Sequence, residues 1–211
     1  MKTNKLIIVK KDGEKIEVEA VEGLNLTLTG ENNVVTIYEP FKFNNVNIRL
    51  TGDAEVVIDS GSCIVHGFRI IKTRNIKKNK LVIGKDFHCG ANCVIDMTDA
   101  GDIIIGDDAK WSWNIYVKSD DTHPIFEIDT KKCVNASTEI SIGNHVWIGM
   151  NVVILKNSII KDNSIIGACS VVASKFEEEN VIVAGNPAKI RKRNINWAHG
   201  SVEDYIKNVN K

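Results

Sequence analysis

One histidine of this chain lies in a polar segment where its side chain could accept a proton. The segment is KSDDTHPIFEID, residues 118–129, and the histidine is His123. Imidazole has an ordinary pKa of about 6.5, so a neutral ring could take a proton from a hydroxyl group at neutral pH. Pro124 limits the backbone of His123 to extended conformations, which would help to hold the ring in place. From these residues alone, a solvated loop histidine is the simpler interpretation.

The chain on either side of this segment repeats every six residues. Aliphatic side chains recur at this spacing at Ile142, Ile148, Ile154, Ile160, Ile166 and Val172. The same spacing recurs upstream at Ile58, Ile64 and Ile70, at Ile83, Cys89 and Ile95, and at Ile105, Trp111 and Val117. A period of six does not match the period of an α-helix, which is about 3.6 residues. The pattern therefore predicts an all-β solenoid in which each repeat is a short strand followed by a corner.

Side-chain alternation along each strand predicts which residues face the core. In the triplet Val146, Trp147 and Ile148, the first and third residues point inward and Trp147 points outward. The inward position two residues before the column is small or β-branched, at Val146, Val152, Ser158, Ser164 and Ser170. Glycine follows the column at three corners, where we expect it to supply unusual backbone angles, at Gly143, Gly149 and Gly167.

Three insertions interrupt the repeat, near residues 74–80, near 97–101 and, the longest, at 119–139. We predict one solenoid domain over residues 1–200, with irregular first coils at 1–45, followed by a short helix at 201–211. Ser201 and Asp204 have the spacing of a capping box at the start of that helix.

Composition excludes several classes of protein. The 27 basic residues balance 27 acidic ones, which gives no electrostatic case for binding nucleic acid or a charged membrane surface. No apolar run approaches the length of a membrane span, and the first residues do not resemble a signal sequence. Five cysteines without the spacing of a disulfide framework agree with a reducing compartment. We therefore expect a cytoplasmic protein.

Two longer segments carry a specific resemblance. ISIGNHVWIGMNVVILKNSIIKDNSIIGACSVVASK and VIVAGNPAKIRKR resemble the hexapeptide-repeat acyltransferases, whose repeats form a left-handed parallel β-helix. The motifs THPIF, NPAK and NINW are most similar to bacterial sialic-acid and polysialic-acid O-acetyltransferases and related capsule-sugar enzymes. The resemblance extends from about residue 81 to residue 198. It implies acetyl-CoA as donor, a carbohydrate acceptor, no metal, and a homotrimer with active sites between subunits.

The resemblance also implies catalytic roles. His123 matches the loop histidine that acts as general base in these enzymes, and Trp147 matches the tryptophan at their donor site, whose indole N–H could hold the thioester oxygen. The residues alone also allow Trp147 to pack between subunits. Two other histidines remain alternatives for the base, since His88 faces outward and His145 lies at a corner, so that either could line a cleft.

Acceptor binding has two candidates, Asn114 and His145. Relatives carry an asparagine near the position of Asn114, although a plain corner asparagine is the other interpretation. Asp120 and Asp121 could orient His123 or simply solvate its loop, and the sequence does not decide between these roles. The segment HCGANC does not predict a metal site, because Cys89 and Cys93 point inward while His88 points away from them.

The coenzyme is expected to bind toward the C-terminal end. Small residues there would let the pantetheine arm approach the backbone, and the candidates, besides Trp147, are Gly149, Gly167, Ala168, Ala184 and Gly185. Cationic residues that follow could pair with its phosphates, namely Lys189, Arg191 and Arg193. A solvated basic tail is the alternative.

Outward positions in successive repeats are apolar, at Trp147, Val153, Ile159, Ile165 and Val171. We interpret them as one stripe that a neighbouring subunit of the trimer covers.

The predicted function is direct transfer of an acetyl group from acetyl-CoA to a sugar hydroxyl, with His123 as base. An amino-sugar N-acetyltransferase would share the donor site and the base. A non-catalytic β-helix module and a β-helix carbonic anhydrase are further alternatives. An anhydrase needs three histidines that converge on zinc, and His88, His123 and His145 are the three near the repeats.

Overall fold

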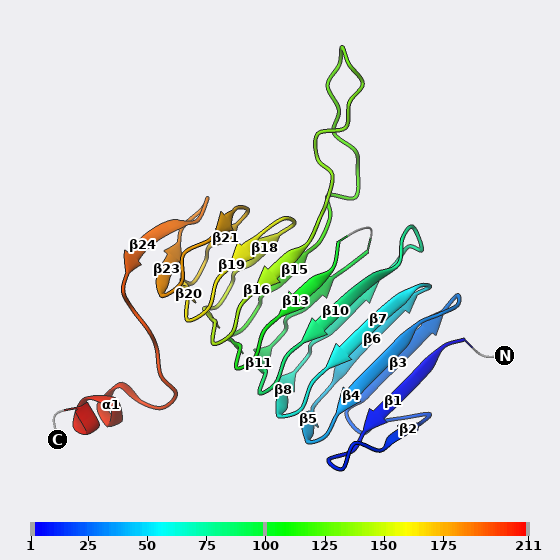
Figure 1. The fold of residues 1–211 in the computed structure, drawn as a ribbon, viewed down its shortest axis with the longest axis horizontal. Helices are drawn as coiled ribbons and strands as arrows, with labels where there is room; N and C mark the ends of the chain where they lie inside the picture. Colours follow the sequence, from blue (N-terminus) through cyan, green and yellow to red (C-terminus); the bar gives the residue numbers. More distant parts are fainter. Residues whose placement is uncertain (1–2, 99–100, 210–211) are drawn as a thin grey trace.

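The computed structural model describes residues 3–98 and 101–209, which form a β-solenoid with one short C-terminal helix (Figure 1). Residues 1–2, 99–100 and 210–211 lie outside the described residues, and so do the parts of the predicted first coil, the insertion at 97–101 and the predicted terminal helix that fall on them. The predicted all-β solenoid is confirmed.

Three sheets run along the solenoid, and their strands are parallel except for the terminal strands β2 and β24. Sheet A contains, in spatial order, β2 (Lys15–Glu17), β1 (Lys5–Val9), β4 (Val34–Tyr38), β7 (Ala54–Ile58), β10 (Asn79–Ile83), β13 (Ile103–Ile105), β16 (Ile140–Ile142), β19 (Ile159–Ile160) and β22 (Lys175–Phe176). Sheet C contains β5 (Phe41–Phe43), β8 (Ser62–His66), β11 (His88–Ala91), β14 (Lys110–Trp111), β17 (Trp147–Ile148), β20 (Ile165–Ile166), β23 (Val181–Ala184) and β24 (Lys189–Arg193). Sheet B contains β3 (Leu24–Thr29), β6 (Val46–Thr51), β9 (Arg69–Lys72), β12 (Val94–Asp96), β15 (Tyr116–Lys118), β18 (Val153–Leu155) and β21 (Val171–Val172).

The chain visits these faces in the order A, C, B, so neighbouring repeats lie on different faces. Trp147 therefore shares sheet C with Ile165, whereas Val153 and Val171 lie on sheet B and Ile159 lies on sheet A. The expected single apolar stripe is wrong for this reason. A residue is stacked on its equivalent one whole coil later, three repeats along the chain.

The interior contains the predicted inward column. Ile142, Ile148, Ile154, Ile160, Ile166 and Val172 are all buried, as are their equivalents upstream. Full burial of one such side chain contributes roughly 1.5–3 kcal/mol relative to exposure. Ser158, Ser164 and Ser170 fill the narrow inward positions and donate hydrogen bonds to backbone carbonyls. Because each coil packs only on its neighbours, the column gives a rigid scaffold for outward side chains.

The corners turn in a different way from the one predicted. The residue three positions before the inward column has a left-handed backbone, as at His145 (φ 53°), Asn151 (φ 57°) and Cys169 (φ 59°). Gly143, Gly149 and Gly167 do not adopt positive φ. They are needed because neighbouring coils approach closely, and a Cβ on Gly167, for example, would lie 2.8 Å from Cβ of Ala184.

The first coils continue the same sheets with longer strands. β3 pairs with β6 over six residues, and β1 pairs with β4 over five. Strands of this length obscure the six-residue spacing in the sequence.

All three insertions leave the solenoid at the same vertex, where the chain passes from sheet B to sheet A. The longest one, between β15 and β16, projects far from the body (Figure 1). It is a narrow hairpin, with an antiparallel bridge between Phe126 and Cys133. We call residues 119–139 the catalytic loop candidate.

The terminal helix α1 (Val202–Val209) begins after Ser201, whose Oγ accepts the N–H of Asp204 at 3.1 Å. The predicted helix cap is confirmed. In the described part of the chain, no helix is both long and apolar enough to cross a membrane.

Candidate functional site

Trp147 projects from β17 on the outer face of sheet C. Val146 and Ile148 on either side are fully buried, whereas Trp147 is 43% exposed. The alternation predicted from the sequence is therefore confirmed. Lys110 of β14 and Ile165 of β20 lie in register with Trp147 on the neighbouring coils. The coil thus fixes the indole at one height along the face.

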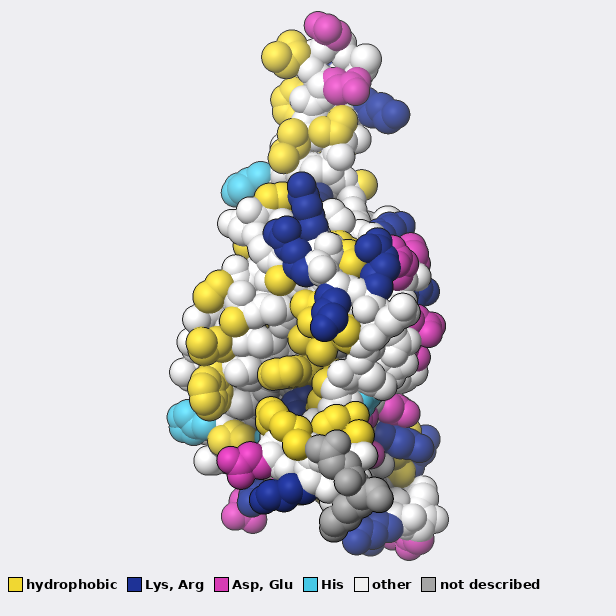
Figure 2. Space-filling view, turned by 90° about the vertical axis from the view of Figure 1, so that its left-hand side faces the viewer, with side chains coloured by type: hydrophobic (Ala, Val, Ile, Leu, Met, Phe, Trp, Pro, Cys, Tyr) yellow, Lys and Arg dark blue, Asp and Glu magenta, His cyan; other side chains and the backbone are white. Residues whose placement is uncertain are grey.

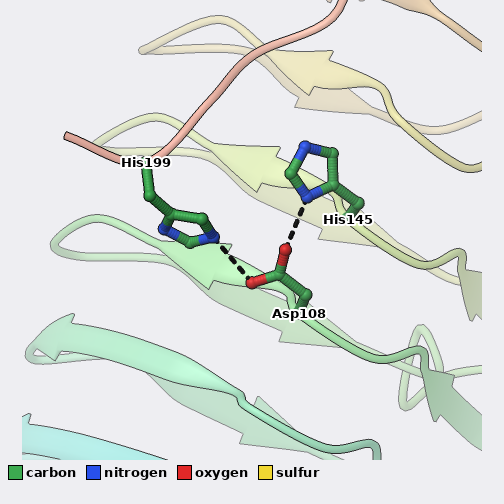
Figure 3. Close-up of side chains that lie close together, drawn as sticks. All are labelled: Asp108, His145 and His199. Atoms are coloured by element: carbon green, nitrogen blue, oxygen red, sulfur yellow. Dashed lines mark hydrogen bonds and ion pairs between the residues drawn. The ribbon is translucent and has the colours of Figure 1, made fainter. Parts of the chain in front are cut away.

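Three polar side chains form a cluster at the corner between sheets A and C, beside Trp147 (Figure 3). Oδ2 of Asp108 lies 2.5 Å from Nδ1 of His145, and Oδ1 lies 2.8 Å from Nε2 of His199. Asp108 and His145 occupy the same corner position on successive coils, as the hydrogen bond from His145 N–H to the carbonyl of Asp107 shows. His199 comes from a different part of the chain.

His199 belongs to the C-terminal strap, residues 194–201, which runs from β24 to α1 (Figure 1). Trp197 of the strap stacks on His145, with ring centroids 4.0 Å apart. The indole N–H of Trp197 donates to the carbonyl of His145 at 2.8 Å, and Nε2 of His145 lies 3.0 Å from the carbonyl oxygen of Trp197. Both ring nitrogens of His145 are therefore occupied, which leaves neither to take a proton from a substrate.

The cluster also determines the charge of its carboxylate. Burial by itself would raise the pKa of Asp108, but hydrogen bonds from His145 and His199 outweigh this effect and lower its pKa below the ordinary value. Asp108 is therefore ionised at neutral pH and holds both histidines.

The same cluster resembles a metal site only in the short distances between its possible ligand atoms. Asp108, His145 and His199 each place one ligand atom within 4.8 Å of the others. However, both histidines direct these nitrogens at the carboxylate, and Nζ of Lys110 lies 3.0 Å from Nδ1 of His199. A bound cation would face the charge of Lys110. The donor set fits a hydrogen-bonded network and does not fit a zinc site.

The three histidines considered for an anhydrase do not converge. His145 lies in the corner cluster and His88 lies on β11 of sheet C. His123 lies in the loop at the vertex between sheets B and A. Cys89 and Cys93 are fully buried, as their inward positions predicted.

A pocket of about 510 Å³ opens on sheet C beside Trp147. It extends from Trp147 over the coils that precede it, and the strap closes one side. Indole side chains of Trp113, Trp147 and Trp197 contribute to its walls, and Lys110 and His88 contribute polar groups. Burial lowers the pKa of His88, and the charge of Lys110 lowers it further, so His88 is neutral at pH 7.

The catalytic loop candidate is held at its base by polar contacts. Asn135 donates to the carbonyl of His123 and to Oδ2 of Asp121, each at 2.9 Å. Asp121 also pairs with Lys156 at 2.6 Å, which together with these contacts lowers the pKa of Asp121. Oδ1 of Asp120 accepts the N–H of Thr122 at 2.7 Å. These contacts fix the backbone around His123, whose side chain is exposed.

His123 and Trp147 are on opposite sides of one chain. The loop leaves at the vertex between sheets B and A, and sheet C is the face across from that vertex. The structure therefore does not bring the two predicted catalytic residues together within a single chain.

The small residues predicted to bind the coenzyme do lie together. Gly149, Gly167 and Ala184 stand on successive coils, since Gly149 N–H donates to the carbonyl of Ile166 and Gly167 N–H donates to that of Val183. A Cβ on Gly149 would lie 2.8 Å from the backbone nitrogen of Ala168. Gly185 follows Ala184 directly on the same coil, at the end of β23. The column runs from Trp147 toward the C-terminal end of the solenoid.

Basic side chains gather at that end, below the projecting loop (Figure 2). β24 supplies Lys189, Arg191 and Arg193, all exposed. Arg191 donates from Nε to the carbonyl of Ala184 at 2.9 Å, and Arg193 makes a two-point ion pair with Glu178. Two of the three predicted phosphate ligands are thus engaged within the chain.

Asn114 is a corner residue with φ 58°, and its Nδ2 donates to Oδ1 of Asn151 on the next coil at 3.0 Å. The pocket walls do not include it. Sequence reasoning missed Asp108, Lys110, Trp113, Trp197 and His199. The signal for Trp197 was present in the motif NINW.

Comparison with known proteins places these features in a family. The family model described as bacterial transferase hexapeptide (six repeats) matches residues 139–174. An uncharacterized 24.8 kDa protein in the cps region of Klebsiella pneumoniae is 32% identical over 186 residues, which cover 88% of this chain and 79% of that protein. The chain belongs to the bacterial hexapeptide-repeat transferases.

Within this class, the similarity is to enzymes that acetylate polysialic acid. The polysialic acid O-acetyltransferase of Escherichia coli O1:K1 / APEC is 38% identical over 130 residues, which cover 62% of this chain and 42% of the relative. The chain thus spans less than half the length of that relative. The crystal structure of the polySia specific acetyltransferase NeuO superposes with a TM-score of 0.79 at 27% identity, covering 98% of this chain and 94% of NeuO. The resemblance inferred from the sequence motifs is confirmed.

Proposed function

We propose that this protein transfers the acetyl group of acetyl-CoA to a hydroxyl group of sialic acid or another surface polysaccharide. The observation that carries the proposal is the position of Trp147, an exposed indole between a column of small residues on one side and a pocket on the other. The similar enzymes act on polysialic acid, by their names. Use of acetyl-CoA as donor would locate the reaction in the cytoplasm.

The coenzyme binds, in this proposal, along the column from Gly149 to Gly185, with its thioester at Trp147. None of the described residues accepts a hydrogen bond from the indole N–H of Trp147. This N–H is therefore available to the thioester oxygen. Lys189 and Arg191 at the end of the column would face the coenzyme phosphates.

His123 acts from a neighbouring subunit of a homotrimer. Its loop projects away from its own sheet C, and the loop tip exposes four apolar side chains, each more than half accessible, at Ile125, Phe126, Ile128 and Val134. Exposed apolar side chains of this kind indicate a partner surface. A cyclic trimer with parallel solenoids would place each loop against sheet C of the next subunit and complete each site between two chains.

The reaction needs one proton carrier and no covalent enzyme intermediate. The neutral ring of His123 takes the proton of the sugar hydroxyl while the hydroxyl oxygen attacks the thioester carbonyl carbon. The carbon–oxygen bond forms, the oxyanion is held by a donor such as the Trp147 N–H, and the carbon–sulfur bond then breaks. The proton passes from His123 to the leaving thiolate of coenzyme A. One subunit thus supplies the base, His123, and its neighbour supplies the oxyanion donor, Trp147.

The test is release of free thiol from acetyl-CoA with a panel of acceptors. Sialic acid and its oligomers should release thiol, and the product should be an ester that mild alkali cleaves. An amino sugar as the only acceptor, with an alkali-stable amide product, would assign the chain to N-acetylation. Absence of thiol release with every acceptor would contradict the proposal.

A further inference from the structure

The pocket on sheet C lies on the side of Trp147 away from the column of small residues. Outward residues of sheet C stand in register, one per coil, as Ile182, Ile165, Trp147, Lys110 and His88. Neighbouring coils are separated by about 4.8 Å. The face is therefore apolar on the C-terminal side of Trp147 and polar, with a positive charge, from the next coil onward.

The pocket walls combine flat aromatic surfaces with this charge. Trp113 is 56% exposed at the pocket and Trp147 is 43% exposed, while Trp197 of the strap adds a third indole. An indole covers the apolar face of a ring and leaves the rim of the ring free for hydrogen bonds. Walls of this kind with a few polar groups are typical of pockets that orient a small polar ring.

The charge in the pocket has one sign. Among the described residues that line it, Lys110 is cationic and none is acidic. Asp108, the carboxylate of the adjoining corner, is bound to His145 and His199. An anionic group that enters the pocket would meet Lys110 without facing a like charge.

Lys110 is held in place and still has donors to offer. Nζ of Lys110 donates to Nδ1 of His199 at 3.0 Å, and Nε2 of His199 donates to Asp108. An ammonium group has three N–H donors, and this contact uses one. The relay from Asp108 through His199 keeps the ammonium at the pocket, one coil from Trp147.

We infer that this pocket binds the acceptor sugar and that Lys110 recognises a carboxylate on it. The inference rests on the proposed function and adds the acceptor side of the site. The acetyl donor reaches Trp147 along the small-residue column, and the acidic sugar reaches it from the opposite side, with its ring against Trp113 and Trp147. His199, Trp197 and His145 are positioning residues, because they hold Lys110 and the pocket wall without themselves offering a free group to the sugar carboxylate.

The test compares two acceptors and three variants. The acceptors are a short sialic-acid oligomer and the same oligomer with its carboxyl groups reduced to alcohols. With the wild-type protein, the reduced oligomer should have a KM roughly 10- to 100-fold higher, because a charge-assisted hydrogen bond is lost. Lys110→Gln should raise the KM of the acidic oligomer by a similar factor and leave the KM of the reduced oligomer and of acetyl-CoA unchanged. Lys110→Arg should restore most of the loss.

A matched control is available on the same face. Lys42 of β5 is exposed and occupies the equivalent outward position, in register through Cys63 and His88, but does not line the pocket. Lys42→Gln should leave all three KM values unchanged. Equal KM values for the two oligomers with the wild-type protein, or an unchanged KM in Lys110→Gln, would overturn the inference.

A failure of the proposed function would look different. Quenching of tryptophan fluorescence by the acidic oligomer measures binding without turnover. Binding that depends on Lys110, together with no thiol release, would contradict acetyl transfer and support the pocket. Thiol release that is indifferent to Lys110 and to the carboxylate would support acetyl transfer and contradict the pocket.

Discussion

Trp197 lies flat against His145, with ring centroids 4.0 Å apart and ring planes 3° from parallel. Two hydrogen bonds, of 2.8 and 3.0 Å, join the same two residues. The pair fastens the C-terminal strap to the solenoid corner, and the centroid of Trp197 is 6.2 Å from that of Trp147. The strap is thus held at the pocket wall by this pair and by the contacts of His199 with Asp108 and Lys110.

Trp197→Ala should loosen the strap, although His199 still contacts Asp108. The substitution removes the stacking and the indole hydrogen bond, each about 1 kcal/mol, but keeps the backbone carbonyl bonded to His145, so the acceptor KM should rise by roughly 10-fold. The KM for acetyl-CoA should stay the same, and hydrogen exchange over residues 194–201 should become faster. Trp197→Phe keeps a stacked ring and should recover part of the loss. Tyr205→Ala in helix α1 is the control and should change none of these values. Unchanged exchange in Trp197→Ala would show that other contacts hold the strap.

His123→Ala should lower kcat by about 10² to 10⁴, because general-base assistance is typically of this size. The fold and the binding of acetyl-CoA should be retained. His145→Ala should act mainly on the acceptor KM, because its ring and Nε2 hold Trp197 of the strap while its Nδ1 is bonded to Asp108. His88 lines the pocket beside Trp147 and is the alternative base. If His123→Ala retained kcat within a few-fold while His88→Ala lost it, the base would be His88.

The regular part of the fold could be predicted because the six-residue repeat is a multiple of the two-residue alternation of a strand, so equivalent residues of every repeat face the same way. The six-residue spacing gave the inward column, and strand alternation gave the outward position of Trp147. The prediction of a single outward apolar stripe was wrong because three repeats form one coil. Val153 and Ile159 therefore lie on faces other than that of Trp147. The corner glycines were predicted for their backbone freedom, but close approach of coils is what requires them.

The site could be predicted only in part. Asp108 lies three residues before Trp111 and His145 lies three residues before Ile148, so both occupy the same corner position. Their contact could have been found by aligning the repeats across the long insertion. His199 lies 91 residues from Asp108, outside the repeat, and no spacing in the sequence indicates that the strap returns to this corner.

The pH behaviour of His88 follows from its neighbours. Burial lowers its pKa first, and Lys110 lowers it further, so Lys110→Gln should raise the pKa of His88 toward its ordinary value. NMR titration of the ring protons measures this shift. Because the folded-state pKa lies below the unfolded one, the stability contributed by neutral His88 is present above about pH 6.5 and declines as the pH falls through the folded-state pKa. An unchanged pKa in Lys110→Gln would place Lys110 away from His88.

Removal of metal should have no effect. The ring nitrogens of His145 and His199 that point at Asp108 are already bonded to it. Dialysis against EDTA should therefore leave turnover unchanged, and metal analysis of the purified protein should find less than one zinc per chain. Stoichiometric zinc that is lost together with activity would instead support a metal centre at this corner.

We propose that each site takes His123 from one subunit and Trp147 from the next. Two inactive variants, His123→Ala and Trp147→Ala, should be co-expressed with different tags, and trimers carrying both tags should be purified. Each mixed cyclic trimer then contains one site with an intact loop and an intact sheet C face, so turnover per chain should return to about one third of the wild-type value. Mixed trimers as inactive as either variant alone would contradict a site shared between subunits.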